Sequence, residues 1–131
     1  MSLVSLSYIS IITRQVSELP DFYIEVFGLE EILASRSDRY RELSLGDVKL
    51  GFPSVDTYQL LDMGDQADPT GVRTLITFAV ETAALVDRLT GLAVDRRGRL
   101  VKPPFATSFG QYLSVILDPE GNAIRISAVL P

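Results

Sequence analysis

An acidic tight turn followed by an arginine-bearing strand is the part of this sequence best suited to binding chemistry. The turn spans residues 118–122 and reads DPEGN. Its aspartate can accept hydrogen bonds from backbone N–H groups, its proline fixes the first turn torsion, and its glycine or asparagine can adopt a positive φ. In the strand that follows, Ile124 and Ile126 share one face, whereas Arg125 and Ser127 share the other. What Arg125 faces is therefore the functional question.

The composition removes several kinds of chemistry. The chain has no cysteine, which excludes disulfides, thiolate nucleophiles and cysteine-based metal sites. It also has no histidine, so it lacks the usual general base near neutral pH and the commonest nitrogen ligand for metals. A net charge of −5 argues against a nucleic-acid partner, because phosphate binding requires a basic surface. One short basic run, Arg36, Arg39 and Arg41, is expected to be a solvated hairpin surface.

Length and hydropathy predict one soluble domain. The 131 residues are 47% hydrophobic, which is enough to bury a core. No apolar run is long enough to cross a bilayer, and no charged-then-apolar signal pattern is seen. We therefore expect a cytoplasmic protein with no membrane partner.

The predicted secondary structure occurs twice along the chain. In each half, alternating apolar residues predict a strand, a periodic apolar stripe predicts a helix, and three short strands follow. The first helix is expected to begin at Ser17, with Pro20 in its first turn, and to end at Gly28. The second helix is expected to run from Thr82 to Gly91. The predicted strands are residues 6–12, 30–35, 40–45 and 47–52 in the first half, and 74–80, 94–98, 111–117 and 123–129 in the second.

The duplicated pattern predicts a single α+β domain over residues 1–131, built from two tandem βαβββ modules at about 3–53 and 72–130. We expect curved mixed β-sheets around a cavity, with the helices outside. Residues 54–71 are a long crossover, and we expect a linker or a flap over a site there. Pro103-Pro104 is expected to stiffen a second loop. The apolar residues expected to face the helices are Ile9, Ile11, Ile76, Phe78, Ile124 and Ile126.

Two motifs resemble the vicinal oxygen chelate superfamily. They are DFYIEVFGL at residues 21–29 and DPEGN at residues 118–122. This superfamily includes glyoxalase I, bleomycin-resistance proteins, extradiol dioxygenases and fosfomycin-resistance enzymes. The resemblance covers nearly the whole chain and implies the fold. It does not specify the activity, because the superfamily supports many functions on one scaffold.

Metal-using members of this superfamily look alike at four inward positions, where His or Glu stands on the first and last strand of each half. Aligning the motifs places Tyr8, Gly51, Leu75 and Arg125 at these positions. Glycine and leucine side chains offer no donor, and the permanent charge of arginine repels a cation. A tyrosine must ionise before it binds a metal well. We therefore expect no metal and no other cofactor.

The rest of the inward face is mostly small or apolar with a few polar groups, which is typical of a pocket for an organic molecule. Arg125 is its one fixed charge and Lys49 a second cation, so an anionic group on the ligand is the simplest complement. No catalytic residue is assigned. The predicted ligand-binding residues are Tyr8, Ser10, Lys49, Gly51, Leu75, Thr77, Tyr112 and Arg125.

Two of these residues have a structural alternative. Arg125 could pair with a nearby carboxylate such as Glu42 or Asp47, because an unpaired buried arginine is costly. Tyr8 could fill the volume of the absent metal site, with its hydroxyl bound to the backbone, rather than serve as a catalytic phenol.

Three functions are compatible with the sequence. The one we favour is a metal-independent protein that binds or sequesters a small organic molecule, similar to the bleomycin-resistance proteins. We expect it to be a homodimer, because short edge strands and an open sheet face need covering. The second is an enzyme of the superfamily, such as a lyase, an isomerase or a dioxygenase-like enzyme, that acts without the usual metal site. The third is a metalloenzyme with ligands such as Asp62, Asp65 and Asp68, although a solvated acidic loop explains this trio more simply.

Overall fold

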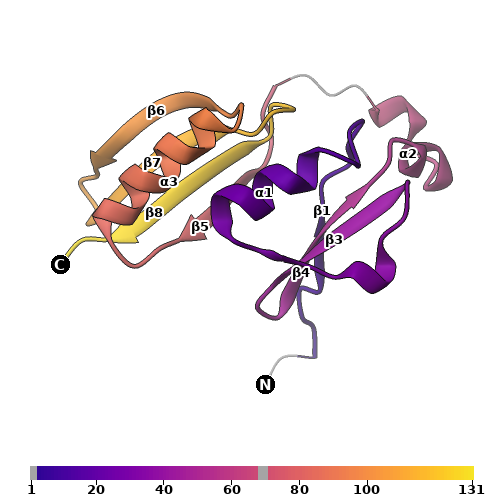
Figure 1. Cartoon of the computed structure of the whole chain (residues 1–131), viewed down its shortest axis with the longest axis horizontal. Helices are drawn as coiled ribbons and strands as arrows, with labels where there is room; N and C mark the ends of the chain where they lie inside the picture. The colour runs from indigo at the N-terminus through magenta and orange to yellow at the C-terminus, as the bar shows by residue number, and fades with distance from the viewer. Residues whose placement is uncertain (1–2, 68–70) are drawn as a thin grey trace. The chain divides into compact units, whose positions relative to one another are not determined.

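A computed structural model describes residues 3–67 and 71–131 of the chain. The chain divides into two compact units, residues 1–70 and 71–131, which we call the first and second modules. Each module contains a four-stranded mixed sheet with a helix packed on it (Figure 1). The α+β fold of two tandem βαβββ modules that the duplicated sequence pattern predicts is confirmed.

The first module forms a sheet in the strand order β1-β4-β3-β2. The β1–β4 pair is parallel, and the other two pairs are antiparallel. The segment after β4 is not a structureless loop, because it contains a short helix and a 3-10 turn. The elements are β1 (Tyr8–Ser10), α1 (Leu19–Phe27), β2 (Glu30–Glu31), η1 (Leu33–Ser35), β3 (Tyr40–Leu45), β4 (Val48–Pro53), α2 (Asp56–Leu60) and η2 (Gly64–Gln66).

Helix α1 begins one residue later than its sequence suggests and ends where predicted. The predicted N-cap at Ser17 is wrong: Glu18 occupies the N-cap, and no side chain caps the helix. The Gln15 carbonyl instead accepts from the N–H groups of Glu18 and Leu19 at 3.0 and 2.8 Å, so a backbone turn satisfies these donors. At the other end, Gly28 adopts a φ of 69° and donates to the Ile24 carbonyl, as predicted.

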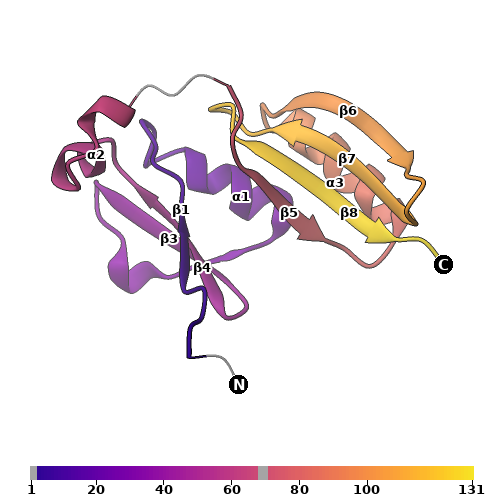
Figure 2. The same cartoon turned by 180° about the vertical axis from the view of Figure 1, so that it is seen from behind.

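The second module repeats this plan with the strand order β5-β8-β7-β6. The β5–β8 pair is parallel and the others are antiparallel. Its helix covers one face of the sheet: the helix lies in front of β7 and β8 in Figure 1, and these strands lie in front of the helix in Figure 2. The elements are β5 (Leu75–Ala79), α3 (Ala83–Asp95), β6 (Arg99–Ala106), β7 (Gln111–Leu117) and β8 (Ala123–Val129).

The structure corrects two boundaries in the second module. Helix α3 does not end at Gly91 but continues to Asp95, so the strand predicted at 94–98 is wrong. A glycine within a helix costs only about 1 kcal/mol, and two residues further on the helix buries Ala93 completely. Pro103-Pro104 lies inside β6 rather than in a loop. An edge strand tolerates proline, and the pairing with β7 shifts register between Lys102 and Phe105.

Each module has its own apolar core between sheet and helix. In the first, the rings of Tyr23 on α1 and Phe52 on β4 lie 5.2 Å apart, and both are fully buried. In the second, Ile124 and Ile126 are fully buried, and Val86 of α3 is buried too. A buried hydrogen bond of 2.7 Å between Thr90 and Ser114 ties α3 to β7. None of the helices in the described parts of the chain is long and apolar enough to span a membrane.

Candidate functional site

The structure brings four predicted ligand-binding residues together on one face of the first sheet. Tyr8 pairs with Lys49, and Ser10 pairs with Gly51, in the parallel register of β1 and β4. Directly paired residues project to the same side of a sheet, so all four share one face. This is the face opposite α1, because Phe52 of the next register position packs against Tyr23 of the helix. We call the face of each sheet opposite its own helix the open face.

Tyr8 and Lys49 contact each other on this face. Lys49 Nζ donates to Tyr8 Oη at 3.5 Å and lies 5.3 Å from the centroid of the Tyr8 ring. Tyr8 is 45% exposed, and its hydroxyl meets a side chain rather than the backbone. These contacts do not match the interpretation of Tyr8 as a buried volume filler.

A tyrosine–carboxylate pair on β3 completes the open face of the first module, and the sequence analysis did not place it there. Glu42 pairs with Gly51, so Glu42 and Tyr40 lie on the same face as Tyr8. Tyr40 Oη donates to Glu42 Oε2 at 2.8 Å, and Ser35 Oγ donates to Glu42 Oε1 at 2.8 Å. Burial, together with the hydrogen bond and charge of Glu42, raises the pKa of the Tyr40 hydroxyl, with a smaller contribution from Tyr8.

The predicted residues of β5 and β8 also lie together, on the open face of the second sheet. Thr77 pairs with Arg125, and Leu75 precedes Thr77 by two positions on the same face. Arg125 Nε donates to Thr77 Oγ1 at 3.0 Å. Within residues 71–131, all of which the structure describes, no carboxylate forms an ion pair with Arg125. Glu42, one expected partner, has both carboxylate oxygens bound to neighbours in its own module.

Tyr112 does not belong with Arg125. It lies on the helix face of the second sheet, where its hydroxyl donates to Asp87 Oδ1 of α3 at 2.7 Å. This hydrogen bond is the main reason that the pKa of Tyr112 is raised. Its neighbour two positions on, Ser114, also faces α3. Tyr112, predicted as a ligand-binding residue, therefore lies on the face opposite to that of Arg125. The cavity expected within the curved sheets stays a prediction.

The residues at the four expected metal positions do not fit a divalent cation. Gly51 and Leu75 have no donor atom, and Arg125 is a cation. Position 51 also has no room for a metal-ligating side chain, because a Cβ atom added to Gly51 would lie 2.8 Å from Tyr40 Oη. Across residues 3–67 and 71–131, no three Asp or Glu side chains gather closely enough to hold a metal ion. Asp62 and Asp65 are among these residues, whereas Asp68 of the alternative acidic trio lies outside the described residues.

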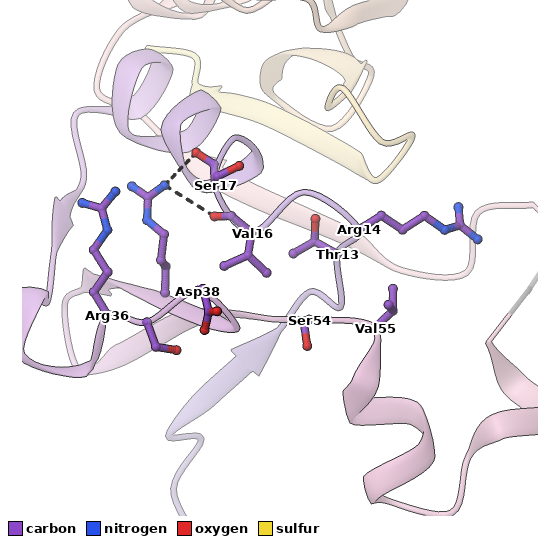
Figure 3. Close-up of a pocket in the computed structure, with 10 residues that line it drawn as sticks. Thr13, Arg14, Val16, Ser17, Arg36, Asp38, Ser54 and Val55 are labelled. Atoms are coloured by element: carbon purple, nitrogen blue, oxygen red, sulfur yellow. Dashed lines mark hydrogen bonds between the residues drawn. The ribbon is translucent and has the colours of Figure 1, made fainter.

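A cavity of about 610 Å³ lies in the first module, away from all predicted ligand-binding residues. It is formed by the segment before α1, by β3 with the residues preceding it, and by the two residues that precede α2. Figure 3 shows Arg36 on one side of it and Arg14 directed away from Arg36. The hydrogen bonds drawn there end on the Val16 and Ser17 carbonyls and come from Arg41.

The arginines of this cavity do not make it an anion site. Arg41, the last member of the predicted solvated run, is only 2% exposed, because strand alternation turns it toward the helix with Leu43. Its guanidinium is neutralised by Glu31 and Asp21, and Arg36 shares Glu31 at 3.5 Å. The expectation that this whole run is solvated is wrong for Arg41.

Comparison with known proteins decides the family. A model of the Glyoxalase/Bleomycin resistance protein/Dioxygenase superfamily matches residues 5–126. The chain belongs to this superfamily. The solved structure of a glyoxalase/bleomycin resistance protein/dioxygenase family enzyme from Burkholderia phytofirmans PsJN is 36% identical, with a TM-score of 0.94 over 97% of this chain and 100% of that chain. The resemblance stated from the two sequence motifs is thereby confirmed.

More distant members of the glyoxalase superfamily share the fold. A glyoxalase-related enzyme from Fulvimarina pelagi is 21% identical, with a TM-score of 0.82 over 96% of this chain and 88% of that chain. A lactoylglutathione lyase from Agrobacterium tumefaciens is 18% identical, with a TM-score of 0.70 over 95% of this chain and 92% of that chain. No curated protein matches this chain.

Proposed function

We propose that this member of the glyoxalase superfamily is a metal-independent protein that binds or sequesters a small organic molecule, whose anionic group meets Arg125. The observation that carries the proposal is the position of Arg125 on the open face of the second module. Its Nε is bound to Thr77 Oγ1 at 3.0 Å, and within the described residues 71–131 it pairs with no carboxylate.

The chemistry of this arrangement favours an anion. Arginine keeps its charge at all physiological pH values, and its planar fork matches a carboxylate in two parallel hydrogen bonds. Thr77 uses only the Nε–H group, so the two terminal nitrogens remain for a ligand. Leu75, which is 42% exposed beside this pair, offers apolar surface to the body of an organic acid.

Metal independence rests on the donor set. By the alignment of the two motifs, the four positions of metal ligands in metal-using relatives fall on Tyr8, Gly51, Leu75 and Arg125 in this chain. Two of these side chains lack donors, and a third repels cations. Stoichiometric zinc, nickel or iron in the purified protein, lost in a Tyr8→Phe variant, would contradict this part of the proposal.

Arg125→Ala should weaken the binding of organic acids by about 1.5–3 kcal/mol, because a charge-assisted hydrogen bond is lost. A thermal-shift screen of organic acids and antibiotics identifies binders, and calorimetric titration gives the dissociation constants. Arg88→Ala is the matched control, since it removes the same charge from the exposed surface of α3. Unchanged affinity in a destabilised Arg125→Ala protein would show a purely structural arginine.

The enzyme alternative is tested with the same variants. Loss of turnover in both Tyr8→Phe and Arg125→Ala, with binding retained in one of them, would favour it over sequestration.

We also propose a homodimer. The parallel edge strand β1 has only three residues, and large apolar side chains such as Leu6, Leu75 and Val129 are 62%, 42% and 74% exposed. Light scattering at micromolar concentration should give twice the 14.4 kDa mass of the chain. A monomer mass across this range would contradict the proposal.

A further inference from the structure

The sheet of the second module carries positive charge and no negative charge. Strands β5 to β8 contain no aspartate or glutamate, and their charged residues are Arg99, Lys102 and Arg125. Lys102 and Arg125 both pair with Val115 of β7. Arg99 pairs with Leu117, two positions along the same strand. Because directly paired residues share a face, all three cations lie on the open face of this module.

An irregularity in β6 turns Lys102 toward this face. Leu100 pairs with Ile116, which is fully buried on the helix face of β7. Lys102 lies two positions after Leu100, yet it pairs with Val115, only one position away from Ile116. The extra residue, Val101, shifts the alternation of β6 by one residue, as a β-bulge does. Regular alternation would have left Lys102 on the helix face with Leu100.

Phe105 holds the Lys102 ammonium group near the same face. Phe105 pairs with Leu113 of β7, and Lys102 Nζ lies 4.3 Å from the centroid of the Phe105 ring. An aromatic ring attracts a cation without neutralising its charge. Within residues 71–131, all of which are described, no carboxylate forms an ion pair with Lys102. The charge of this exposed lysine is therefore positioned and remains available to an anion.

Lys102 and Arg125 stand on either side of one apolar residue. They belong to β6 and β8, and Val115 of β7 lies between them. Neighbouring strands lie about 4.8 Å apart, so the backbones of the two cations are about 10 Å apart. On β5, Thr77 binds Arg125 Nε and leaves the terminal nitrogens of Arg125 for a ligand. Two anionic groups joined by a short apolar chain complement this row of residues.

We propose that Lys102 is a second anchor of the ligand site and that the ligand is a dicarboxylic acid, whose two ends meet Arg125 and Lys102. This assignment rests on the proposed function, because it names the class of organic acid that Arg125 binds. All the residues it uses belong to the second module, so the site is complete within one compact unit.

The test compares dicarboxylates with their monomethyl esters, which keep the chain length and lose one charge. Glutarate, adipate, suberate and the three esters are titrated into the full-length protein by calorimetry. The wild type should bind the best dicarboxylate about tenfold more tightly than its ester, the effect of one charge-assisted hydrogen bond. Lys102→Met, which removes the charge and keeps most of the side-chain volume, should bring the two affinities together.

Two further variants separate a specific contact from a general positive field. Lys102→Arg keeps the charge and should keep the preference for the dicarboxylate. Arg99→Ala removes a cation from the same face about 7 Å further along the strands, and it should also keep most of the preference.

The outcomes distinguish this inference from the proposed function. If acids bind but the wild type does not prefer a dicarboxylate over its ester, only this inference is overturned. The same holds if Lys102→Met keeps the wild-type preference, or if Arg99→Ala lowers it as much as Lys102→Met does. If neither the dicarboxylates nor their esters bind the wild type, the proposed function fails, and this inference fails with it.

Discussion

Arg41→Met should lower the free energy of unfolding by about 3–5 kcal/mol, the effect expected when one partner of a buried ion pair is removed. The Arg41 side chain is 2% exposed, and the carboxylate side chain of Glu31 beside it is 8% exposed. Without Arg41, the buried carboxylate of Glu31 would keep only the 3.5 Å ion pair with Arg36, a side chain that is 50% exposed. The loss therefore comes mainly from a stranded charge rather than from the missing contacts themselves.

The hydrogen bonds of Arg41 explain why no other residue can replace it. Its Nε and Nη2 donate to the two oxygens of Glu31 at 3.0 and 2.6 Å, and Nη2 also donates to Asp21 at 2.8 Å. Nη1 donates to the Ser17 and Val16 carbonyls at 3.1 and 3.5 Å. All five N–H groups of the guanidinium are used, and they join β2, α1 and the segment before it. Lysine has three donors in a different geometry, so Arg41→Lys should also be strongly destabilising.

Urea unfolding of the full-length protein measures this loss. Arg39→Ala is the control from the same basic run, because the Arg39 and Asp56 side chains are 74% and 66% exposed at 3.6 Å. An exposed pair of this kind contributes at most about 1 kcal/mol. Adding Glu31→Gln to Arg41→Met should recover part of the stability, since it removes the stranded charge. Equal losses of unfolding free energy in Arg39→Ala and Arg41→Met would show that the buried ion pairs of Arg41 contribute no more than an exposed pair.

The sequence was informative where a local pattern decides the structure. The positive φ of Gly28, the side-chain cap at Thr82 and the turn at 118–122 each follow from the residue types present. The two motifs and the repeat then sufficed for the family and the fold. The burial of Arg41 could also have been predicted, because Arg41 lies on the same strand face as Leu43 and Leu45, two apolar residues that mark the helix face.

The remaining features depend on contacts between strands, which local patterns do not contain. Both faces of β7 carry apolar residues, so alternation alone cannot say which one meets the helix. The hydrogen bond between Tyr112 and Asp87 settles this. The closeness of Tyr40 to Gly51 likewise requires the register of β3 against β4. Helix α3 passes Gly91 because burial further along the helix outweighs a small local cost.

Asp118→Ala should lower the free energy of unfolding by about 3 kcal/mol, because the turn at 118–122 depends on one buried carboxylate. Asp118 is 3% exposed, and its Oδ1 accepts from the backbone N–H groups of Glu120 and Asn122 at 2.9 and 3.0 Å. The Asn122 amide donates to both oxygens, at 3.1 and 2.8 Å. Alanine would leave these part-buried donors without their acceptor.

Asp118→Asn is the graded control, since it keeps one carbonyl oxygen but no charge. It should cost about 1 kcal/mol, the usual value of a single hydrogen bond. Chemical denaturation followed by circular dichroism measures both variants. The turn joins β7 to β8, and β8 carries Arg125, so a loosened turn should also weaken acid binding at constant folded fraction. Equal stability of Asp118→Ala and the wild type would mean that the backbone bonds from Asp118 to Asn122 and Gly121 hold this hairpin without the side chain.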